Sequence, residues 1–348
     1  MTPTSDPSPA GHYPRLLGDI GGTNARFAWQ VAAGAPLTDV ASYLCAEHAS
    51  LQAVMRHYLA AHHKRAPRGC AIAMANPVTG DTVRMTNHHW SFSISALQRE
   101  LGIERLAVIN DFTAVALSLP ALAATELRQI GAGTAVPGAP MAVLGPGTGL
   151  GVSGLLPVAP GHYASIAGEG GHVTLSAGNA HEAAVLQWLH SRFGHASAER
   201  ALSGPGLVNL YEAACALSGQ EASALTPAEV IARARSGSEA ACVAALELFC
   251  GFLGSVAGNL ALTLGARGGL YVAGGMAPRL IAEIAASSFR ERFESKGRFR
   301  GYLAAIPTFI IDVDVSPALI GASRALDRAA LDMPTPNMPA LDPAAPVA

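Results

Sequence analysis

The chain has 348 residues, a formal net charge of -2, 50% hydrophobic residues and 14% charged residues. This length is comfortable for two domains with sizeable cores, and the low charged fraction is typical of a folded chain. The small net charge gives no basic footprint, so we expect no nucleic-acid partner. Five cysteines lie far apart and form no CxxC pair, which favours reduced thiols in a cytoplasmic protein.

The two ends and one apolar stretch stand apart from the rest. Residues 1–13 form a polar tail without a signal segment, residues 331–348 are rich in Pro and Ala, and we expect both to be disordered. Residues 242–265 are long enough to span a bilayer and carry one charge, Glu247. Because they also contain four glycines and lack basic flanks and an aromatic belt, we expect a helix buried in the protein and no membrane partner.

The first predicted elements form a hairpin around two glycines. Residues 16–26, LLGDIGGTNAR, predict a strand, a tight loop and a returning strand, and residues 40–45 predict a third strand. Gly21 and Gly22 can adopt positive φ, so that backbone N–H groups converge on a phosphate. Asp19 cannot bind that anion directly and instead suits a magnesium ion, reached through water, that holds the phosphates. An ordinary Asp-Gly turn is the alternative interpretation.

Alternating strands and helices follow the hairpin. Apolar residues at helical spacing predict helices, and short apolar runs bounded by turn residues predict strands. The helices are expected at residues 51–64, 95–101 and 112–119, and the strands at residues 69–75, 82–86 and 105–110. This order is typical of a mainly parallel sheet covered on both faces, with an antiparallel hairpin at its start.

The second half of the chain repeats the strand, glycine turn and strand of the opening hairpin. Residues 141–144 and 152–158 predict two strands joined by GPGTGLG, residues 145–151. Two copies of a strand, glycine turn and strand suggest a duplicated fold with a cleft between its halves. The loop has no Lys-Ser/Thr pair and carries Leu150 at the last glycine position of a GxGxxG frame. It therefore matches neither the Walker A nor the Rossmann fingerprint.

The remaining predicted elements complete an α/β chain. Thr226 and Pro227 are a good helix opening, with the threonine as N-cap and the proline in the first turn. The other helices are expected at residues 181–193, 203–217 and 317–328 and from Pro278 onward, and the strands at residues 269–273 and 308–313.

Asn110 and Asp111 follow the predicted strand at residues 105–110. Ligands bind where the strands of open parallel sheets end, so both side chains are candidates for a binding site. Asp111 has two interpretations: it caps the helix that follows, or it accepts a proton from a substrate hydroxyl.

Three polar residues of the second half are further candidates. Glu169 and His172, in GEGGH, could be an acid and a base, two metal ligands or two hydrogen-bonding groups for a polyol. His172 could also be a core histidine, and Glu199 could form an ion pair with its neighbour Arg200. No Cys or His cluster lies nearby in sequence, which disfavours a structural zinc. Together with Asn110 and Asp111, these side chains form a set suited to the hydroxyls of a sugar.

Glycine loops add a nucleotide site to this set. Gly147, Thr148 and Gly149 could hold further phosphate oxygens, while Gly274 and Gly275 let a flat base approach the backbone; ordinary turns are the alternative for each loop. The implied reaction is phosphoryl transfer to an alcohol, with catalysis by positioning and by magnesium and with Asp111 as the base.

Eight segments in chain order are similar to those of bacterial glucokinases. They are GDIGGTNAR (18–26), MTNHHW (85–90), INDFTAV (109–115), GTGLGV (147–152), GEGGHV (168–173), AERALSGPGLVNLYEA (198–213), GNLAL (258–262) and VAGGMAPR (272–279). The resemblance covers residues 14–328 and implies the two-lobed actin/hexokinase-like (ribonuclease H-like) α/β fold, with duplicated mixed sheets and an interdomain cleft. It implies a small domain of residues 14–121 and 308–330, a large domain of residues 122–307, and a homodimer.

The resemblance also implies an activity and its residues. The activity is the ATP-dependent phosphorylation of D-glucose to glucose 6-phosphate, the first step of glycolysis, in the cytoplasm. Glucose is held by the residues that match Asn110, Asp111, Glu169, His172 and Glu199, with Asp111 as the catalytic base. The ATP positions match Gly18, Asp19, Ile20, Gly21, Gly22, Thr23, Gly147, Thr148, Gly149, Gly274 and Gly275, and Asp19 meets Mg²⁺ through water.

The sequence departs from the family in three respects, and two rival functions also fit it. Pro146 stands where the family loop often has a small residue, both tails are extra segments, and the cysteine cluster that binds zinc in the related repressor and sugar-kinase group is absent from the sequence. The rival functions are a kinase for another hexose, such as mannose, glucosamine or fructose, and a non-catalytic sugar-sensing regulator. Too few residues precede the first predicted strand for a helix-turn-helix module.

Overall fold

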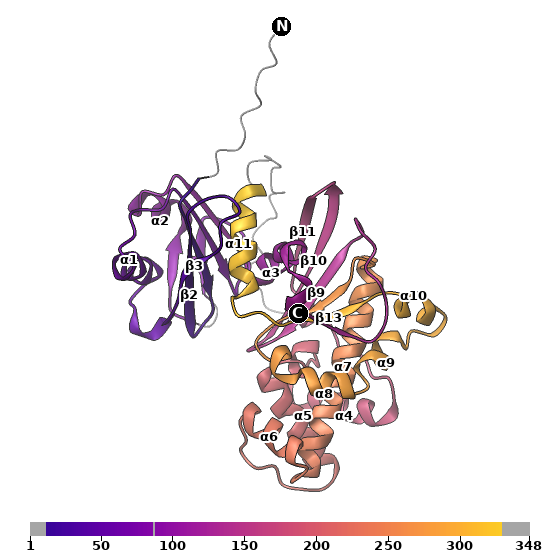
Figure 1. The fold of residues 1–348 in the computed structure, drawn as a ribbon. Helices are drawn as coiled ribbons and strands as arrows, with labels where there is room; N and C mark the ends of the chain where they lie inside the picture. Colours follow the sequence, from indigo (N-terminus) through magenta and orange to yellow (C-terminus); the bar gives the residue numbers. More distant parts are fainter. Residues whose placement is uncertain (1–11, 86–87, 329–348) are drawn as a thin grey trace. The chain divides into compact units, whose positions relative to one another are not determined.

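The computed structural model describes residues 12–85 and 88–328 (Figure 1). The predicted tail at residues 331–348, most of the tail at residues 1–13 and two residues of the segment at 85–90 lie outside this part of the chain. The chain divides into two compact units. The first unit contains the chain up to Ala121 and again from Asp314, and the second contains Leu122–Val313.

The first unit is built on a five-stranded sheet with the order β3-β2-β1-β4-β7. Its strands are β1 (Arg15–Ile20), β2 (Asn24–Gln30), β3 (Thr38–Leu44), β4 (Gly69–Met74) and β7 (Arg105–Asn110). β1, β4 and β7 are parallel, whereas β1, β2 and β3 pair antiparallel. Half of the pairings are therefore antiparallel and the sheet is mixed rather than mainly parallel, because short turns return the chain directly beside the strand it has just left.

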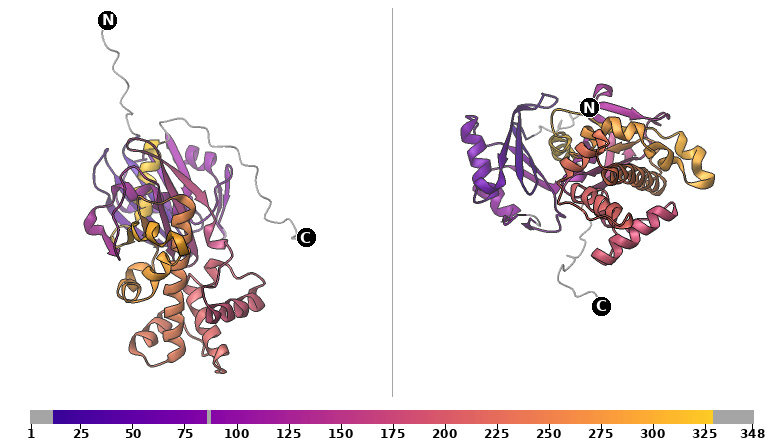
Figure 2. Two further views of the ribbon diagram at one scale, coloured as in Figure 1. Left: turned by 90° about the vertical axis from the view of Figure 1, so that its right-hand side faces the viewer. Right: turned by 90° about the horizontal axis from the view of Figure 1, so that it is seen from below.

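Both faces of this sheet are covered, as the alternation of helices and strands predicted. Leu16 of β1 packs in a core with Val54 and Tyr58 of α1 (Leu51–Ala61), while its neighbour Leu17 packs on the opposite face with Leu319 of α11 (Pro317–Arg328). Successive side chains of a strand point to opposite faces, so one apolar strand serves two cores. Figures 1 and 2 show α11, in yellow, beside the indigo strands from the start of the chain.

Two short elements of the first unit depart from the expected order. The predicted strand at residues 82–86 appears as β5 (Thr82–Arg84), which pairs with β6 (Ser91–Ser93) in a separate two-stranded ribbon.

The unit's other helices are α2 (Ile94–Glu100) and α3 (Asp111–Ser118), with short 3₁₀ turns at Cys45–Glu47 and Leu119–Ala121. α3 packs against α11, so two helices far apart in sequence share one face of the sheet.

The second unit contains a six-stranded sheet with the order β11-β10-β9-β12-β13-β8. Its strands are β8 (Leu127–Ile130), β9 (Met141–Pro146), β10 (Leu150–Ala159), β11 (His162–Gly168), β12 (Leu270–Val272) and β13 (Thr308–Ile311). β9, β12 and β13 are parallel, and β9, β10 and β11 pair antiparallel. The first sheet has the same arrangement in β1, β4 and β7 and in β1, β2 and β3, so the predicted duplication of mixed sheets is confirmed.

Three features of this sheet differ from the expectation. β8 and β11 have no predicted counterpart: β8 is short and half polar, and β11 carries exposed residues at both ends. The strand at residues 308–313 was expected in the small domain, but β13 pairs with β12 and β8 of the second unit. The chain therefore re-enters the first unit at Asp314 rather than at residue 308, because the hydrogen bonds of β13 complete the second sheet.

Helices supply most of the second unit's core. They are α4 (Ala180–Phe193), α5 (Gly204–Leu217), α6 (Pro227–Ser236), α7 (Ala240–Leu264), α8 (Ile281–Ala286), α9 (Phe289–Glu294) and α10 (Arg300–Ala304), with 3₁₀ turns at Ala124–Glu126, Gly170–His172, Ala198–Arg200, Ala277–Leu280 and Gly297–Phe299. Thr226 caps α6, as its sequence predicted, and forms a capping box with Glu229.

α7 contains most of the apolar stretch at residues 242–265, whose length would be enough to span a bilayer. It is long and apolar enough to cross a membrane, but 78% of its most apolar window is buried within the protein. It contacts α5, α6 and α9, and Gly254 and Gly258 allow the backbone of α9 to approach closely. α7 is therefore a central core helix of the second unit, as the sequence indicated.

Candidate active site

The turn after β1 presents polar and glycine residues at the end of the first strand. The N–H of Gly21 donates to the carbonyl of Asn24 (2.9 Å), which closes a tight turn between β1 and β2. Neither Gly21 nor Gly22 has the positive φ that was expected, so the turn closes in ordinary backbone conformations. Thr23 is exposed at its tip, where its backbone and side chain are open to a ligand.

Gly18 and Ile20, which the resemblance places near the phosphates, are buried in β1. A Cβ at Gly18 would lie 2.7 Å from Ile72 Cδ1 on the neighbouring strand, so this glycine is required by packing. The side chain of Ile20 is in the core of the unit. At this end of β1, the residues that reach the surface are therefore Asp19 and the turn residues 21–23.

Asp19 is held by two donors of its own unit. Its Oδ2 accepts a hydrogen bond from Ser316 Oγ (2.8 Å) and another from Arg26 Nη1 (3.3 Å). Arg26 lies directly opposite Asp19 in the antiparallel pair of β1 and β2, so the strand register brings these charges together. Ser316 comes from the far end of the chain, and nothing in its neighbouring sequence marked it as a partner of Asp19.

Asn110 and Asp111 lie where β7 ends and α3 begins. Asn110 is the N-cap: its Oδ1 accepts from the N–H of Thr113 (3.0 Å), so the interpretation of Asp111 as the cap was wrong. Asp111 is the first residue of the helix, and its Oδ1 accepts from the N–H of Phe112 (2.8 Å). A carboxylate at a helix N-terminus is stabilised in its charged form by the helix dipole.

The register of the sheet brings Asp19 and Asp111 to one edge. Ile20 pairs with Met74 and Met74 with Asn110, so β1, β4 and β7 end at the same level. Adjacent strands are about 4.8 Å apart, which places the ends of β1 and β7 about 10 Å from each other. The glycine turn, Asp19 and Asp111 therefore face one edge of the first unit.

The second glycine loop is shorter than its sequence suggested. Pro146, the last residue of β9, pairs with Leu150, the first residue of β10, which leaves a turn of Gly147, Thr148 and Gly149. Pro146 thus belongs to the strand rather than to the turn. The carbonyl of Gly147 accepts a hydrogen bond from the N–H of Gly204 (2.8 Å), which ties the turn to the start of α5.

Glu199 lies against this turn. Its Oε2 accepts a hydrogen bond from the N–H of Leu150 (2.9 Å), and a Cβ at Gly149 would collide with the same oxygen. Its neighbour Arg200 stacks on Phe193 instead, with the guanidinium carbon 4.2 Å from the ring centroid. The alternative of a local ion pair between Glu199 and Arg200 is therefore wrong.

Glu169 and His172 reach the same part of the second unit. Both side chains are exposed, so the interpretation of His172 as a core histidine is also wrong. The loop that carries them packs on the start of β10, where a Cβ at Gly171 would collide with the carbonyl of Leu150. It also contacts the 3₁₀ turn of Glu199, and the N–H of Ala198 donates to the carbonyl of Val173 (2.9 Å).

Gly274 completes this cluster of motifs. It adopts φ +83°, and a Cβ there would lie 2.5 Å from the carbonyl oxygen of Pro146. The N–H of Met276 donates to that carbonyl (3.2 Å), while Gly275 is exposed. The second unit therefore gathers the glycine turn, the Glu169–His172 loop, Glu199 and the Gly274 bend around the adjoining ends of β9, β10 and β12.

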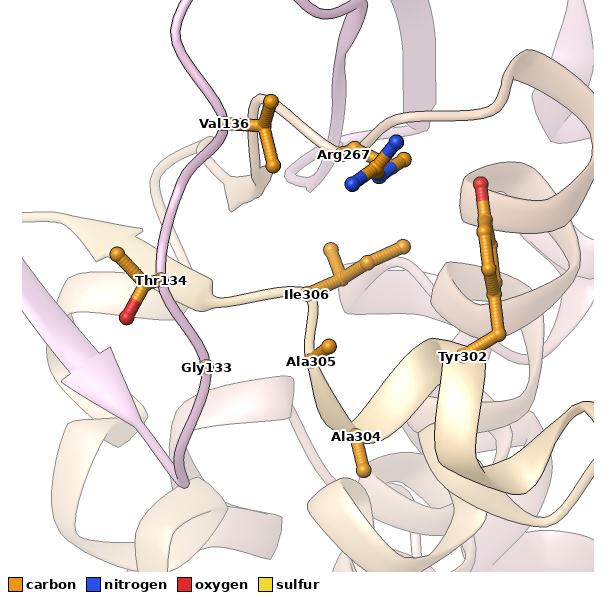
Figure 3. A pocket seen from close by; sticks show the side chains of 8 residues that line it. All are labelled: Gly133, Thr134, Val136, Arg267, Tyr302, Ala304, Ala305 and Ile306. Carbon is orange, nitrogen blue, oxygen red and sulfur yellow. The ribbon is translucent and has the colours of Figure 1, made fainter.

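A pocket of about 620 Å³ lies elsewhere in the second unit (Figure 3). Its walls come from the segment after β8, from Arg267, from α10 and from the chain between α10 and β13. The lining residues are Gly133, Thr134, Val136, Arg267, Tyr302, Ala304, Ala305 and Ile306. None of them belongs to the predicted site, so this pocket is separate from the cluster described above.

A magnesium ion fits the residues at the end of β1. In the described part of the chain no three His, Cys, Asp or Glu side chains gather into a protein-only metal site. Magnesium keeps several waters and is commonly bound by one or two carboxylates together with substrate phosphates. Asp19, a single carboxylate beside a glycine turn, is suited to that mode of binding.

Comparison with known proteins shows the family to which this sequence belongs. The sequence model of the glucokinase family matches residues 16–329. The chain belongs to the glucokinase family. The glucokinase of Aromatoleum aromaticum is 55% identical over 318 residues, which cover 91% of this chain and 96% of that protein. The glucokinase of Chromobacterium violaceum is 52% identical over 314 residues, 90% of this chain and 89% of its own.

Solved structures show the same fold for this glucokinase-family chain. A glucokinase from an Antarctic psychrotroph has a TM-score of 0.82 and 38% identity, over 90% of this chain and 99% of its own. A glucokinase from Streptomyces griseus of the ROK family, solved with glucose and AMPPNP, has a TM-score of 0.60 at 16% identity over 90% and 98% of the two chains. The mixed α/β sheets are thus those of the actin/hexokinase-like sugar kinases.

Proposed function

We propose that this chain is a glucokinase that transfers the γ-phosphoryl group of ATP to the 6-hydroxyl of D-glucose in the cytoplasm. The observation that carries the proposal is the position of Asp111 at the carboxyl end of β7, on the same sheet edge as Asp19 and the glycine turn. This transfer requires one carboxylate that accepts the proton of the hydroxyl and another that binds magnesium. Membership in the glucokinase family and relatives 52% and 55% identical support the proposal.

Five side chains supply the hydrogen-bonding groups for the sugar. Asn110 and Asp111 supply an amide and a carboxylate, and Glu169, His172 and Glu199 supply two carboxylates and an imidazole. Donors and acceptors of this kind discriminate strongly, because a hexose that lacks a matching hydroxyl leaves a polar group unpaired. A glucokinase from Balamuthia mandrillaris has been solved in complex with glucose, which supports glucose as the hexose.

The nucleotide is held by the glycine segments. Backbone N–H groups of residues 18–23 and 147–149 bind the phosphates, and Gly274 and Gly275 leave room for the adenosine. Asp19 would hold Mg²⁺ through water, and the bound ion would neutralise charge on the phosphates. The buried positions of Gly18 and Ile20 restrict them to backbone contacts and to support of the turn.

Asp111 acts as the general base of the reaction. It accepts the proton of the glucose 6-hydroxyl while the 6-oxygen bonds to the γ-phosphorus and the bond to the bridging oxygen breaks, which releases ADP. Asn110 fixes the start of α3 and so fixes the direction of the carboxylate that follows it. Positioning of this kind is the main contribution that a protein makes to phosphoryl transfer.

A coupled assay of ADP release tests the proposal. We expect ADP and glucose 6-phosphate in equal amounts with glucose and MgATP, and a lower kcat/KM for mannose, glucosamine and fructose. The same panel run with polyphosphate identifies the phosphoryl donor. A kcat/KM that is higher for another hexose than for glucose would identify that hexose as the substrate. Glucose binding without any ADP release would indicate a sensor. We also propose the homodimer that the resemblance implies, which size-exclusion chromatography with light scattering tests.

A further inference from the structure

Ser316, a residue of the last part of the described chain, contacts a residue of the first strand. It directly precedes α11, where a serine ordinarily uses its side chain to cap the helix. Its hydroxyl instead donates to Oδ2 of Asp19, with an Oγ to Oδ2 distance of 2.8 Å across 297 residues of sequence. The distance is that of a well-formed O–H···O hydrogen bond, here with a carboxylate as the acceptor.

The carboxylate that receives this bond is largely enclosed. The side chain of Asp19 is 13% exposed, whereas Arg26, its other partner, is 49% exposed and bonds to the same oxygen at 3.3 Å. Two donors on Oδ2 fix the plane of the carboxylate and leave Oδ1 as the oxygen for a further ligand. Ser316 makes the shorter of the two bonds. Its side chain is also the less mobile of the two donors, since a serine has one side-chain torsion and an arginine has four.

α11 holds Ser316 firmly in place. Seven residues further along the helix, Ser323 accepts from Arg15 at the start of β1 (Oγ to Nη1 3.1 Å) and donates to Gln30 of β2 (2.6 Å). Gly321 packs so closely on α3 that a Cβ would overlap the carbonyl of Ala114. The helix is thus attached to both ends of β1, at Arg15 and at Asp19.

We propose that Ser316 is a positioning residue that orients Asp19 toward the magnesium ion of bound nucleotide. The proposal rests on the proposed function, because it assigns to Asp19 the water-mediated contact described above. Partners that orient the ligands of a metal commonly contribute 10–100-fold to metal affinity or activity. Ser316 would carry such a contribution without touching substrate itself.

Two substitutions at residue 316 test this role. Ser316→Ala removes the donor, and Ser316→Thr keeps a hydroxyl in a residue that the extended backbone before a proline accepts well. We expect Ser316→Ala to weaken the binding of Mn²⁺ in the presence of ADP by about tenfold or more, measured by electron paramagnetic resonance. The Mg²⁺ concentration for half-maximal phosphorylation should rise in parallel while KM for glucose changes less than about twofold. Ser316→Thr should restore Mn²⁺ binding.

Ser323→Ala is the matched control. It removes a serine hydroxyl from the same attachment of α11 but from the opposite end of β1, so it should loosen the helix without changing Mn²⁺ binding. Ser316→Cys, which has a similar volume and only a weak donor, replaces Ser316→Ala if that variant does not fold. Unchanged Mn²⁺ binding in the variants without a good donor would overturn the proposal, as would equal losses in Ser316→Ala and Ser323→Ala. A wild-type protein that binds Mn²⁺ and ADP but does not phosphorylate glucose would instead overturn the proposed function.

Discussion

The carboxylate of Glu199 accepts a hydrogen bond from the backbone N–H of Leu150, the first residue after the glycine turn of the second unit, at 2.9 Å. A proposed ligand of the sugar is therefore bonded to the loop that is proposed to hold phosphate. The absence of a side chain at Gly149 makes this contact possible, because a Cβ there would occupy the space of Glu199 Oε2.

Gly149→Ala should weaken glucose binding as well as nucleotide binding. The added methyl group displaces Glu199, so we expect glucose affinity measured by calorimetry to fall by about tenfold, the effect of losing about 1.4 kcal/mol from a charged hydrogen bond. Gly147→Ala is the control on the other side of the same turn, where nothing lies within 4 Å of an added Cβ. Equal glucose affinity in the two variants would contradict a link between Glu199 and the turn.

Asp111→Ala should abolish the formation of glucose 6-phosphate while some glucose binding survives. Removal of a general base typically reduces the rate by 10²–10⁴-fold, and the other hydrogen-bonding groups of the sugar site remain. Single-turnover measurement of glucose 6-phosphate, together with glucose binding by calorimetry, separates chemistry from binding. Near-normal turnover in Asp111→Ala would remove this residue from the mechanism. Asn110→Asp, which keeps an oxygen to cap α3, shows whether the helix start alone is sufficient for activity.

Gly321→Ala should destabilise the first unit. α11 lies so close to α3 that a methyl group at residue 321 overlaps the carbonyl of Ala114, and overpacking of this kind costs about 1–3 kcal/mol. Urea unfolding followed by circular dichroism measures the change in the free energy of unfolding. Gly301→Ala in α10, where nothing lies within 4 Å of an added Cβ, should instead be neutral or stabilising by about 0.4–1 kcal/mol. A stable Gly321→Ala variant would show that the two helices can separate without cost.

The ion pair of Arg68 and Glu104 should make stability depend on acid pH. Hydrogen bonds from Arg68 (Nε to Oε1, 2.8 Å), with a further contribution from His12, lower the pKa of Glu104 to about 2. The pKa in the unfolded chain is about 4.3, so the folded state binds its proton less readily. The contribution to stability is therefore present above pH 4.3 and is lost as the pH falls toward 2.

Urea unfolding of wild type and Glu104→Gln across this pH range measures that contribution. The difference in unfolding free energy between the two proteins should be greatest near neutral pH and should shrink as the pH falls from 5 to 2. A difference that stays constant over this range would show that the charge of Glu104 does not contribute to stability.

The sequence by itself determined the elements whose signals are local. The glycine turns, the apolar strands that lead into them and the buried helix α7 were each predicted from neighbouring residues, since turn residues and hydrophobic periodicity act over a few positions. β7 begins and ends at the predicted residues, Arg105–Asn110, and α11 begins at the predicted Pro317. The candidate residues of the site also came from the sequence, because they follow strands and lie in recognisable motifs.

The tertiary structure alone decided which of these elements are partners. β13 joins the second sheet, β8 and β11 extend that sheet, and Ser316 reaches Asp19 across nearly the whole chain. No short window of sequence contains these relationships, because hydrogen bonds between distant strands and side chains depend on where folding brings them. The sequence thus set the chemistry available at each strand end, and the packing of the sheets and helices decided which groups act together.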